Sequence, residues 1–335
     1  MHHVRLTGTT LLVTALLLAG CGSEDEPDTA ADSGGGADAA ADYPSEQITL
    51  YVPYAPGGPT DLAARTTGAC LQEELGQTVV VENRAGASGS LGMQAMLQGD
   101  ADGYALSLIA VPATATNPLQ MDVGYTNEDY VPIAAVTEIP SVLAVGEDSE
   151  YATAEELLEA ASAEPGELSV AIPGATTSQA MEIRRLADLY DVELTGVPFD
   201  GNAEMTTALL GGNVDAVFIN ASADVLENIE AGSFVPLAQS PEEPVSYLPD
   251  VPTLAELDFP ELTSSVSVFG LSAPAETPEA IVTKLESTVE TCLEKPEVIE
   301  QLDERYVPDE FIGTDAFEER IASIVEAYGP ILEQG

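Results

Sequence analysis

From residue 47 onward, short runs of β-branched and aromatic residues alternate with amphipathic stretches of helical period, and glycine-rich loops separate them. The first unit comprises a strand expected over 47–54, a turn over 55–59 and a helix that ends at Gly76. Thr60 or Asp61 is expected to cap this helix, because either side chain can accept a hydrogen bond from a free backbone amide. Alternation of this kind predicts an α/β fold, with a parallel sheet covered by helices.

The alternation continues over strands expected at 79–82 and 104–109, and it resumes after a strand at 142–145. The later strands are expected at 169–172, 193–197, 214–219, 234–238 and 265–271. The later helices are expected at 178–190, 202–210 and 224–231, with a helical tail over 278–334 interrupted near Pro296 and Pro308. Because the pattern restarts, the folded part is expected to form two lobes with a cleft between them.

The N-terminus has the features of an export signal over residues 1–20. Basic residues precede an apolar run over 11–18, which is too short to span a membrane and ends in small residues before Cys21. The segment Leu18-Ala19-Gly20-Cys21 resembles a lipobox, which implies a diacylated cysteine and an extracytoplasmic protein anchored to the cell membrane. An ordinary secretory signal that ends near a cysteine is the alternative. Residues 21–42 are expected to form a lipidated, disordered linker, because they contain no large apolar residue.

The charge balance is strongly acidic, with Asp+Glu 58 against Lys+Arg 9 and a formal net charge of −49. Such a chain repels the phosphates of nucleic acids, so we expect no nucleic-acid partner. Acids in this excess repel one another in dilute buffer, and salt screens that repulsion. The composition therefore favours a halophilic or salt-tolerant source, although an acidic exported protein from an ordinary habitat is the alternative.

The sequence carries few signals of catalysis. Both histidines, His2 and His3, lie in the export signal, which leaves the mature chain without the commonest general base. No CxxC and no GxxxxGK[ST] motif is present, and the glycines at 86–92 have the wrong spacing for a dinucleotide fingerprint. Paired carboxylates are left open as catalysts, but solvated surface is the commoner role of acids. We therefore expect a protein that is not an enzyme and that uses no metal and no cofactor.

Two loops are candidates for binding an anion without basic side chains, because each leads from a strand into the start of a helix. The first is Tyr54-Ala55-Pro56-Gly57-Gly58-Pro59-Thr60-Asp61, and the second is Gly174-Ala175-Thr176-Thr177-Ser178-Gln179. Free amides and the helix dipole attract anions at such places. If the loops face each other, each could hold one carboxylate group. The alternative is that both are simple tight turns.

A series of short motifs, in this order, resembles one known family. The motifs are YPS at 43–45, VPYAPGG at 52–58, TD at 60–61, VVENRAG at 80–86, DGY at 102–104, NP at 117–118, TSQ at 177–179, VPF at 197–199, DVPT at 250–253, FGL at 269–271 and AP at 273–274. Together they resemble the extracytoplasmic solute receptors of tripartite tricarboxylate transporters, the Bug family, over about 43–328.

The resemblance implies a two-lobe periplasmic-binding-protein-like fold of type II, with the ligand cleft between the lobes. Such a receptor captures a small organic carboxylate and delivers it to large and small membrane permease subunits, and we expect it to be a monomer. The implied lobes are 43–140 and 141–265, with 266–335 returning to the first lobe, and crossings near 138–142 and 263–268. A sensor subunit for a signalling system and a receptor for a non-carboxylate solute are the alternatives.

Carried over by resemblance, the ligand-binding residues are Tyr54, Ala55, Pro56, Gly57, Gly58, Thr60, Asp61, Thr176, Thr177, Ser178 and Gln179, with Asn220 as a weaker candidate. The chain departs from the family at Ala180, Asp200 and Val268, where histidine, lysine and tryptophan are common. Ligand identity therefore does not transfer. The resemblance also brings the helices of Cys70 and Cys292 into one lobe, which favours a disulfide, whereas two separate buried cysteines are the alternative.

Overall fold

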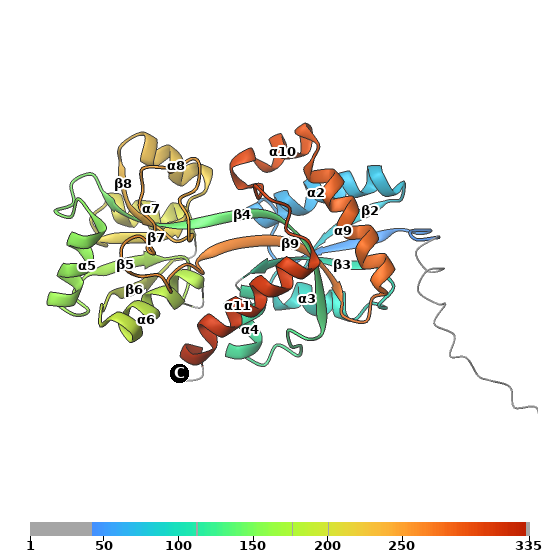
Figure 1. Ribbon diagram of the computed structural model, residues 1–335, viewed down its shortest axis with the longest axis horizontal. Coiled ribbons are helices and arrows are strands. Elements are labelled where there is room, and N and C mark those ends of the chain that lie inside the picture. The colour runs from blue at the N-terminus through green and yellow to red at the C-terminus, as the bar shows by residue number, and fades with distance from the viewer. Residues whose placement is uncertain (1–41, 112, 176, 200, 333–335) are drawn as a thin grey trace, which may run out of the picture. The chain divides into compact units, whose positions relative to one another are not determined.

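The computed structural model describes residues 42–111, 113–175, 177–199 and 201–332 (Figure 1). The expected signal peptide, the lipidation site Cys21, most of the linker over 21–42, and the loop residues Thr176 and Asp200 lie outside the described residues.

The first lobe is built on a sheet with the strand order β2-β1-β3-β9-β4. Its first three strands, β1 (Ile48–Val52), β2 (Val79–Asn83) and β3 (Ala105–Val111), are parallel to one another. β9 (Val266–Pro274) then runs antiparallel to both β3 and β4 (Tyr130–Gly146). The sheet is therefore mixed, which corrects the expectation of a purely parallel sheet.

The second lobe shares β4 with the first. From Tyr130 to Pro140, β4 pairs with β9, and from Ser141 onward it pairs with β7 (Ala216–Asn220) and β8 (Phe234–Gln239). β5 (Ser169–Ile172) and β6 (Thr195–Pro198) complete the second sheet, parallel to β7. β4 and β9 run from one lobe toward the other in Figure 1. The sequence pattern predicted only the last part of β4.

Helices cover both sheets. Those of the first lobe are α2 (Pro59–Leu75), α3 (Ser90–Leu97), α4 (Ala113–Gln120), α9 (Glu279–Leu293), α10 (Pro296–Leu302) and α11 (Thr314–Leu332). Those of the second lobe are α5 (Ala154–Ala163), α6 (Ser178–Tyr190), α7 (Asn202–Leu210) and α8 (Ala223–Glu230). Two 3-10 turns, η1 (Ala87–Gly89) and η2 (Glu304–Tyr306), complete the described elements. α4 was not predicted, whereas the interruptions near Pro296 and Pro308 are confirmed.

The start of α2 differs from the expectation. Gly58 is the capping residue, with no side-chain cap, and Pro59 follows at the first helical positions. Proline suits this place because its ring presets the helical φ and its missing N–H would have no partner in the helix. Thr60 and Asp61 therefore lie inside the first turn, so their prediction as caps was wrong. Thr153 caps α5, since its side chain accepts a hydrogen bond from the amide of Glu156.

Buried side chains stabilise both lobes and the elements that join them. In one cluster, strands of the first lobe pack against α2, α9 and η2, where Leu50, Leu71, Leu285 and Tyr306 are buried. A second cluster contains residues of α6 and α11 together, including Leu186 and Tyr328. A disulfide joins Cys70 in α2 to Cys292 in α9, with their Cα atoms 5.9 Å apart. The late helices are thus tied to the first unit of the chain.

Within the described ranges, none of the helices is long and apolar enough to cross a membrane. The same residues contain no group of histidine, cysteine, aspartate and glutamate side chains that could hold a metal ion.

Candidate functional site

A cleft of about 470 Å³ lies where strands of both sheets end. Its walls come from the residues after β1 and β3 in the first lobe, from the segments after β5 and β7 in the second, and from β9. Because parallel strands end at one edge of a sheet, their loops gather there and form the natural binding site of such folds. We call this hollow the ligand cleft.

Six of the sequence-predicted residues line the ligand cleft: Tyr54, Thr60, Thr177, Ser178, Gln179 and Asn220. Gly57 and Gly58 line an adjoining hollow instead. Ala55, Pro56 and Asp61 are not among the residues that line either one. The cleft thus brings together the two loops that the sequence pattern singled out, although only part of each loop forms its wall.

Asp61 stabilises the first loop through hydrogen bonds, although it does not line the ligand cleft. Its carboxylate accepts hydrogen bonds from the Gly57 amide at 2.9 Å, from Arg65 Nε at 2.9 Å and from Asn83 Nδ2 at 2.9 Å. The hydrogen bond from Arg65 is the main reason that the pKa of Asp61 is lowered to about 2, so this carboxylate is ionised at neutral pH. Gly57 adopts φ +94°, a conformation that favours glycine. These hydrogen bonds therefore restrain the shape of the turn.

A buried hydrogen-bond network supports the second loop. Gln179 Nε2 donates to Ser141 Oγ at 2.9 Å and to Asn220 Oδ1 at 2.8 Å. Ser141 Oγ lies 2.9 Å from Ser265 Oγ, which in turn donates to Ser178 Oγ at 3.1 Å. Ser141 and Ser265 stand where β4 changes partners and just before β9 begins. The network therefore connects the start of α6 to both strands that join the lobes.

The network also orients Asn220. Its Oδ1 accepts hydrogen bonds from Gln179 Nε2 and from Ser267 Oγ, at 2.8 and 3.3 Å. With the oxygen used on the network, the Nδ2 group has no hydrogen-bond partner within the described part of the chain. An amide nitrogen carries two donors. Asn220 is thus a donor on the wall of the ligand cleft.

The Tyr54 hydroxyl also lines the ligand cleft, and it donates to the Ser88 carbonyl at 3.5 Å. Burial is the main cause that raises the pKa of Tyr54 to about 12, so its hydroxyl stays protonated at neutral pH. Thr177 has a local role as well, because its Oγ1 donates to the Gly174 carbonyl at 2.9 Å and caps α6.

The sequence pattern missed several residues of the cleft wall, which are Ala110, Val111, Asn202, Ser222, Asp224, Ser267 and Phe269. The sequence signal that could have found them is their position at the ends of strands, since Val111 ends β3 and Ser222 follows β7. Among the described residues that line the cleft, Asp224 is the single acidic side chain, and no lysine, arginine or histidine occurs. An anion here would be held by amides, hydroxyls and helix starts.

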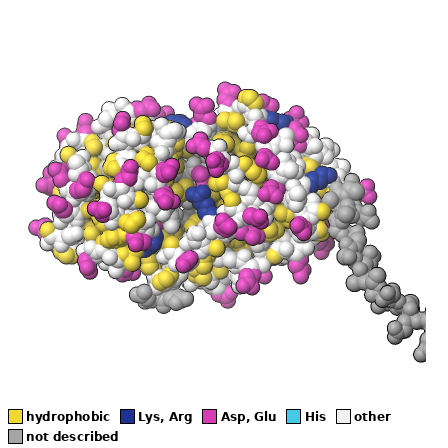
Figure 2. All heavy atoms as spheres, viewed as in Figure 1, with side chains coloured by type: hydrophobic (Ala, Val, Ile, Leu, Met, Phe, Trp, Pro, Cys, Tyr) yellow, Lys and Arg dark blue, Asp and Glu magenta, His cyan; other side chains and the backbone are white. Residues whose placement is uncertain are grey.

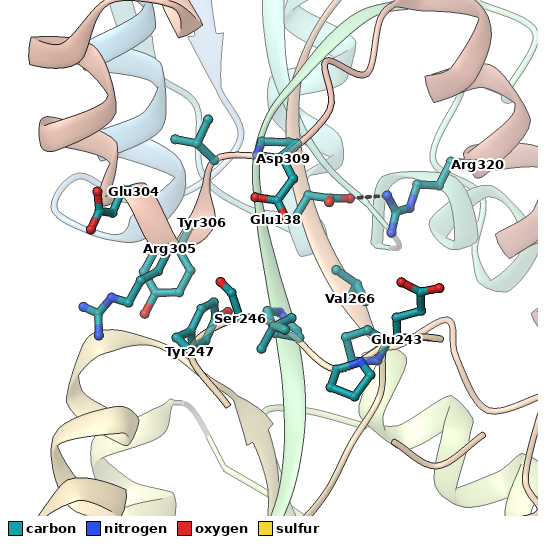
Figure 3. A pocket seen from close by; sticks show the side chains of 16 residues that line it. Glu138, Glu243, Ser246, Tyr247, Val266, Glu304, Arg305, Tyr306, Asp309 and Arg320 are labelled. Atoms are coloured by element: carbon teal, nitrogen blue, oxygen red, sulfur yellow. Dashed lines mark hydrogen bonds and ion pairs between the residues drawn. The ribbon is translucent and has the colours of Figure 1, made fainter. Parts of the chain in front are cut away.

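A different hollow, of about 230 Å³, lies beside the strands that join the lobes (Figure 3). Glu138, Pro140 and Val266 line it, whereas their neighbours Ile139 and Ser267 line the ligand cleft. Because side chains alternate along a strand, the two hollows lie on opposite faces of β4 and β9. Arg320 pairs with Glu138, and Arg305 pairs with Asp303 at 2.6 Å. Its two basic side chains are thus already paired with acids, so this hollow is the weaker candidate for an anion.

The chain is similar to known proteins over most of its length. The family model described as "Tripartite tricarboxylate transporter family receptor" matches residues 63–334. Protein BugT of Bordetella pertussis is 36% identical over 262 residues, which cover 77% of this chain and 79% of that protein.

Solved structures are similar over most of the chain. A TctC solute binding protein from Polaromonas, without ligand, has a TM-score of 0.77 at 29% identity, with 88% of this chain and 100% of that chain covered. The R. palustris protein Rpa4515 with adipate has a TM-score of 0.70 at 30% identity, with 86% and 99% covered. The Polaromonas protein is a solute binding protein, and the two-lobe fold is shared. The chain described here belongs to the receptor family of tripartite tricarboxylate transporters.

Proposed function

We propose that this protein captures a small organic carboxylate in the ligand cleft and delivers it to the large and small membrane permease subunits of a tripartite transporter. One observation carries the proposal: the starts of α2 and α6 meet at a cleft with amide and hydroxyl donors. Such donors suit a carboxylate, because amides at helix starts and neutral hydroxyls all donate toward negative charge. The adipate found in a related receptor is a ligand of this class.

The protein works outside the cytoplasmic membrane, anchored through a diacylated Cys21 and acting as a monomer without catalysis. The lipobox-like segment before Cys21 supports the anchor. We draw the lobe boundaries at 140/141 and 265/266, which is supported by the change of β4 partners between Pro140 and Ser141.

Capture proceeds by closure of the lobes about β4 and β9. In the hydrogen-bond network, Gln179 and Asn220 line the ligand cleft, whereas Ser141 and Ser265 belong to the segments that join the lobes. A ligand that orders Asn220 therefore acts on the same hydrogen bonds that set the geometry of the joining strands.

The ligand is identified by mass spectrometry of small molecules released from protein purified without dialysis. Calorimetry with the released carboxylate then tests the site. Asn220→Asp replaces a donor by an acceptor that carries negative charge, so we expect binding to weaken at least a hundredfold, since an unmet charged group costs roughly 2 to 4 kcal/mol.

Asn213→Asp is the matched control. It adds the same charge in the exposed turn at the other end of β7, so affinity should be unchanged. Equal affinity of the Asn220→Asp variant and the wild type would remove Asn220 from the site, and release of no carboxylate together with no carboxylate binding would overturn the proposed function.

A further inference from the structure

A second hollow of about 390 Å³ adjoins the ligand cleft. Pro59, Ile139, Ser222 and Asp224 line both hollows, so the two share a wall and meet at these residues. Beyond that junction the wall is formed largely by apolar side chains, among them Leu62, Ala63, Leu302 and Tyr306. We call this second hollow the apolar chamber.

The junction carries one negative charge. Asp224 Oδ1 accepts a hydrogen bond from Ser222 Oγ at 2.5 Å. The chamber also contains Asp303, but that carboxylate is paired with Arg305. Among the described residues that line either hollow there is no basic side chain to balance Asp224. Asp224 is exposed and lines both hollows, so a ligand that extends from the cleft into the chamber lies near this carboxylate.

The two ends of the combined space thus differ in chemistry. At one end are Tyr54, Ser178 and Asn220. The hydroxyls of Tyr54 and Ser178 donate to the Ser88 carbonyl and to Gln179 Oε1, whereas the Asn220 Nδ2 group has no partner among the described residues. At the other end is a space far larger than the roughly 150 Å³ that holds a benzene molecule in an engineered protein cavity. Apolar surface buried there contributes about 25 cal/mol per Å². A second carboxylate would instead meet Asp224 and apolar carbon.

We propose that the ligand is an amphipathic monocarboxylate, with its carboxylate among the donors of the ligand cleft and an uncharged apolar body in the apolar chamber, and that Asp224 selects against a second carboxylate. The proposal rests on the proposed function and names its substrate class. Aromatic and branched aliphatic monocarboxylates fit this description, whereas linear diacids do not.

Calorimetry with a matched panel tests the substrate class. The panel contains phenylacetate and 4-methylpentanoate as apolar monocarboxylates, and adipate as a diacid of similar length. We expect the wild type to bind at least one of the two monocarboxylates at least tenfold more tightly than adipate, because two like charges near a cleft wall repel by an amount of this order.

Two variants, each with a matched control, separate the effect of the apolar chamber on affinity from the effect of the Asp224 charge. Leu62→Asn, at a side chain that is 50% exposed, should weaken binding of the preferred monocarboxylate about tenfold, because apolar contact is lost. Leu189→Asn changes a leucine that is 54% exposed on α6 outside both hollows and should leave affinity unchanged. Asp224→Asn should raise adipate affinity about tenfold, whereas Glu227→Gln, which removes a charge from an exposed position on the same helix, should not.

Tightest binding of adipate, with no response to Asp224→Asn, overturns the substrate class but leaves carboxylate capture standing. Loss of binding in Asp224→Asn would show that Asp224 holds a ligand cation, which also overturns the proposal. If neither the panel nor any released carboxylate binds, the proposed function itself fails.

Discussion

At the scale of single residues, Asp61 is buried beneath the loop that leads into α2. It was predicted to contact the ligand, but all three of its hydrogen bonds go to protein groups, and it does not line the ligand cleft. Its contribution to binding is to hold the Gly57 amide and the turn in place, and ligand contact by Asp61 itself stays a prediction.

Asp61→Asn should lower the free energy of unfolding by about 1 to 2 kcal/mol at pH 7, because a charged acceptor for the Gly57 amide and Arg65 is lost. The pKa of Asp61 is lowered to about 2 from an ordinary 3.8, so this stabilisation is present above pH 3.8 and is lost as the pH falls through about 2. Urea unfolding at pH 7 and near pH 2 measures both effects. Asp100→Asn, at an exposed position, is the control, and equal losses in the two variants would contradict the supporting role.

At the scale of elements, α6 and α11 meet at a buried carboxylate. Glu182 on α6 pairs with Arg185 at 3.1 Å, and its Oε1 accepts hydrogen bonds from Tyr328 of α11 at 2.9 Å and from the Ser264 amide at 3.1 Å. Burial nevertheless dominates and raises the pKa of Glu182 to about 7. α11, which returns to the first lobe, is thereby attached to the helix that opens at the ligand cleft.

Glu182 should make stability fall as the pH rises. Between its ordinary pKa of 4.5 and about 7, the folded state holds a proton that the unfolded state has released, so folding is favoured at the acidic end of this window. Glu182→Gln removes the titration, so the wild type should lose up to about 3 kcal/mol relative to the variant between pH 4.5 and 7.5. Urea melts across this range test the difference, with Glu159→Gln on the exposed side of α5 as control. If the free energy of unfolding of the wild type and of Glu182→Gln depends on pH in the same way, the raised pKa of Glu182 is contradicted.

The disulfide between α2 and α9 spans 222 residues of sequence. Closing so long a loop in the unfolded chain corresponds to about 5 kcal/mol in the chain-entropy model, an upper figure that measured disulfides often fall below. We expect the double variant Cys70→Ser/Cys292→Ser to melt at a lower temperature, with reduced wild type as the comparison. Intact-mass analysis of the domain without Cys21, after alkylation under denaturing and non-reducing conditions, should show no added alkyl group, and two added groups would mean free thiols.

At the scale of the whole molecule, the net charge of −49 dominates the surface. Acidic side chains are spread over the whole face shown in Figure 2, and only a few basic ones interrupt them. Neighbouring acids repel one another in dilute buffer, and at about 1 M salt the screening length falls to roughly 3 Å. The surface therefore opposes folding at low salt.

The melting temperature should rise as sodium chloride increases from low to molar concentration, because screening removes this repulsion. Differential scanning calorimetry measures the trend, and sucrose at matched osmolality separates screening from general exclusion effects. A melting temperature that falls steadily with salt would contradict adaptation to salt.

The sequence alone determined most of the local structure, because helical and strand periods depend on residues close along the chain. The ranges expected at 169–172, 178–190 and 202–210 coincide with β5, α6 and α7. The strand-to-helix loops likewise indicated where the ligand cleft would lie, since such loops meet at one edge of a parallel sheet.

Only the tertiary structure decided how these parts combine, because the deciding contacts join residues far apart in sequence. The pairing of β4 with β9 over 130–140 made the sheet mixed, and it begins β4 well before its predicted start at 142. Gln179 and Ser267 donate hydrogen bonds to Asn220 Oδ1, which leaves the Nδ2 group of Asn220 as a donor. A sequence pattern does not show such a side-chain orientation. The apolar chamber, too, exists only because Leu62 of α2, Leu302 of α10 and Asp224 of α8 line one hollow. No local period encodes the proximity of these three helices.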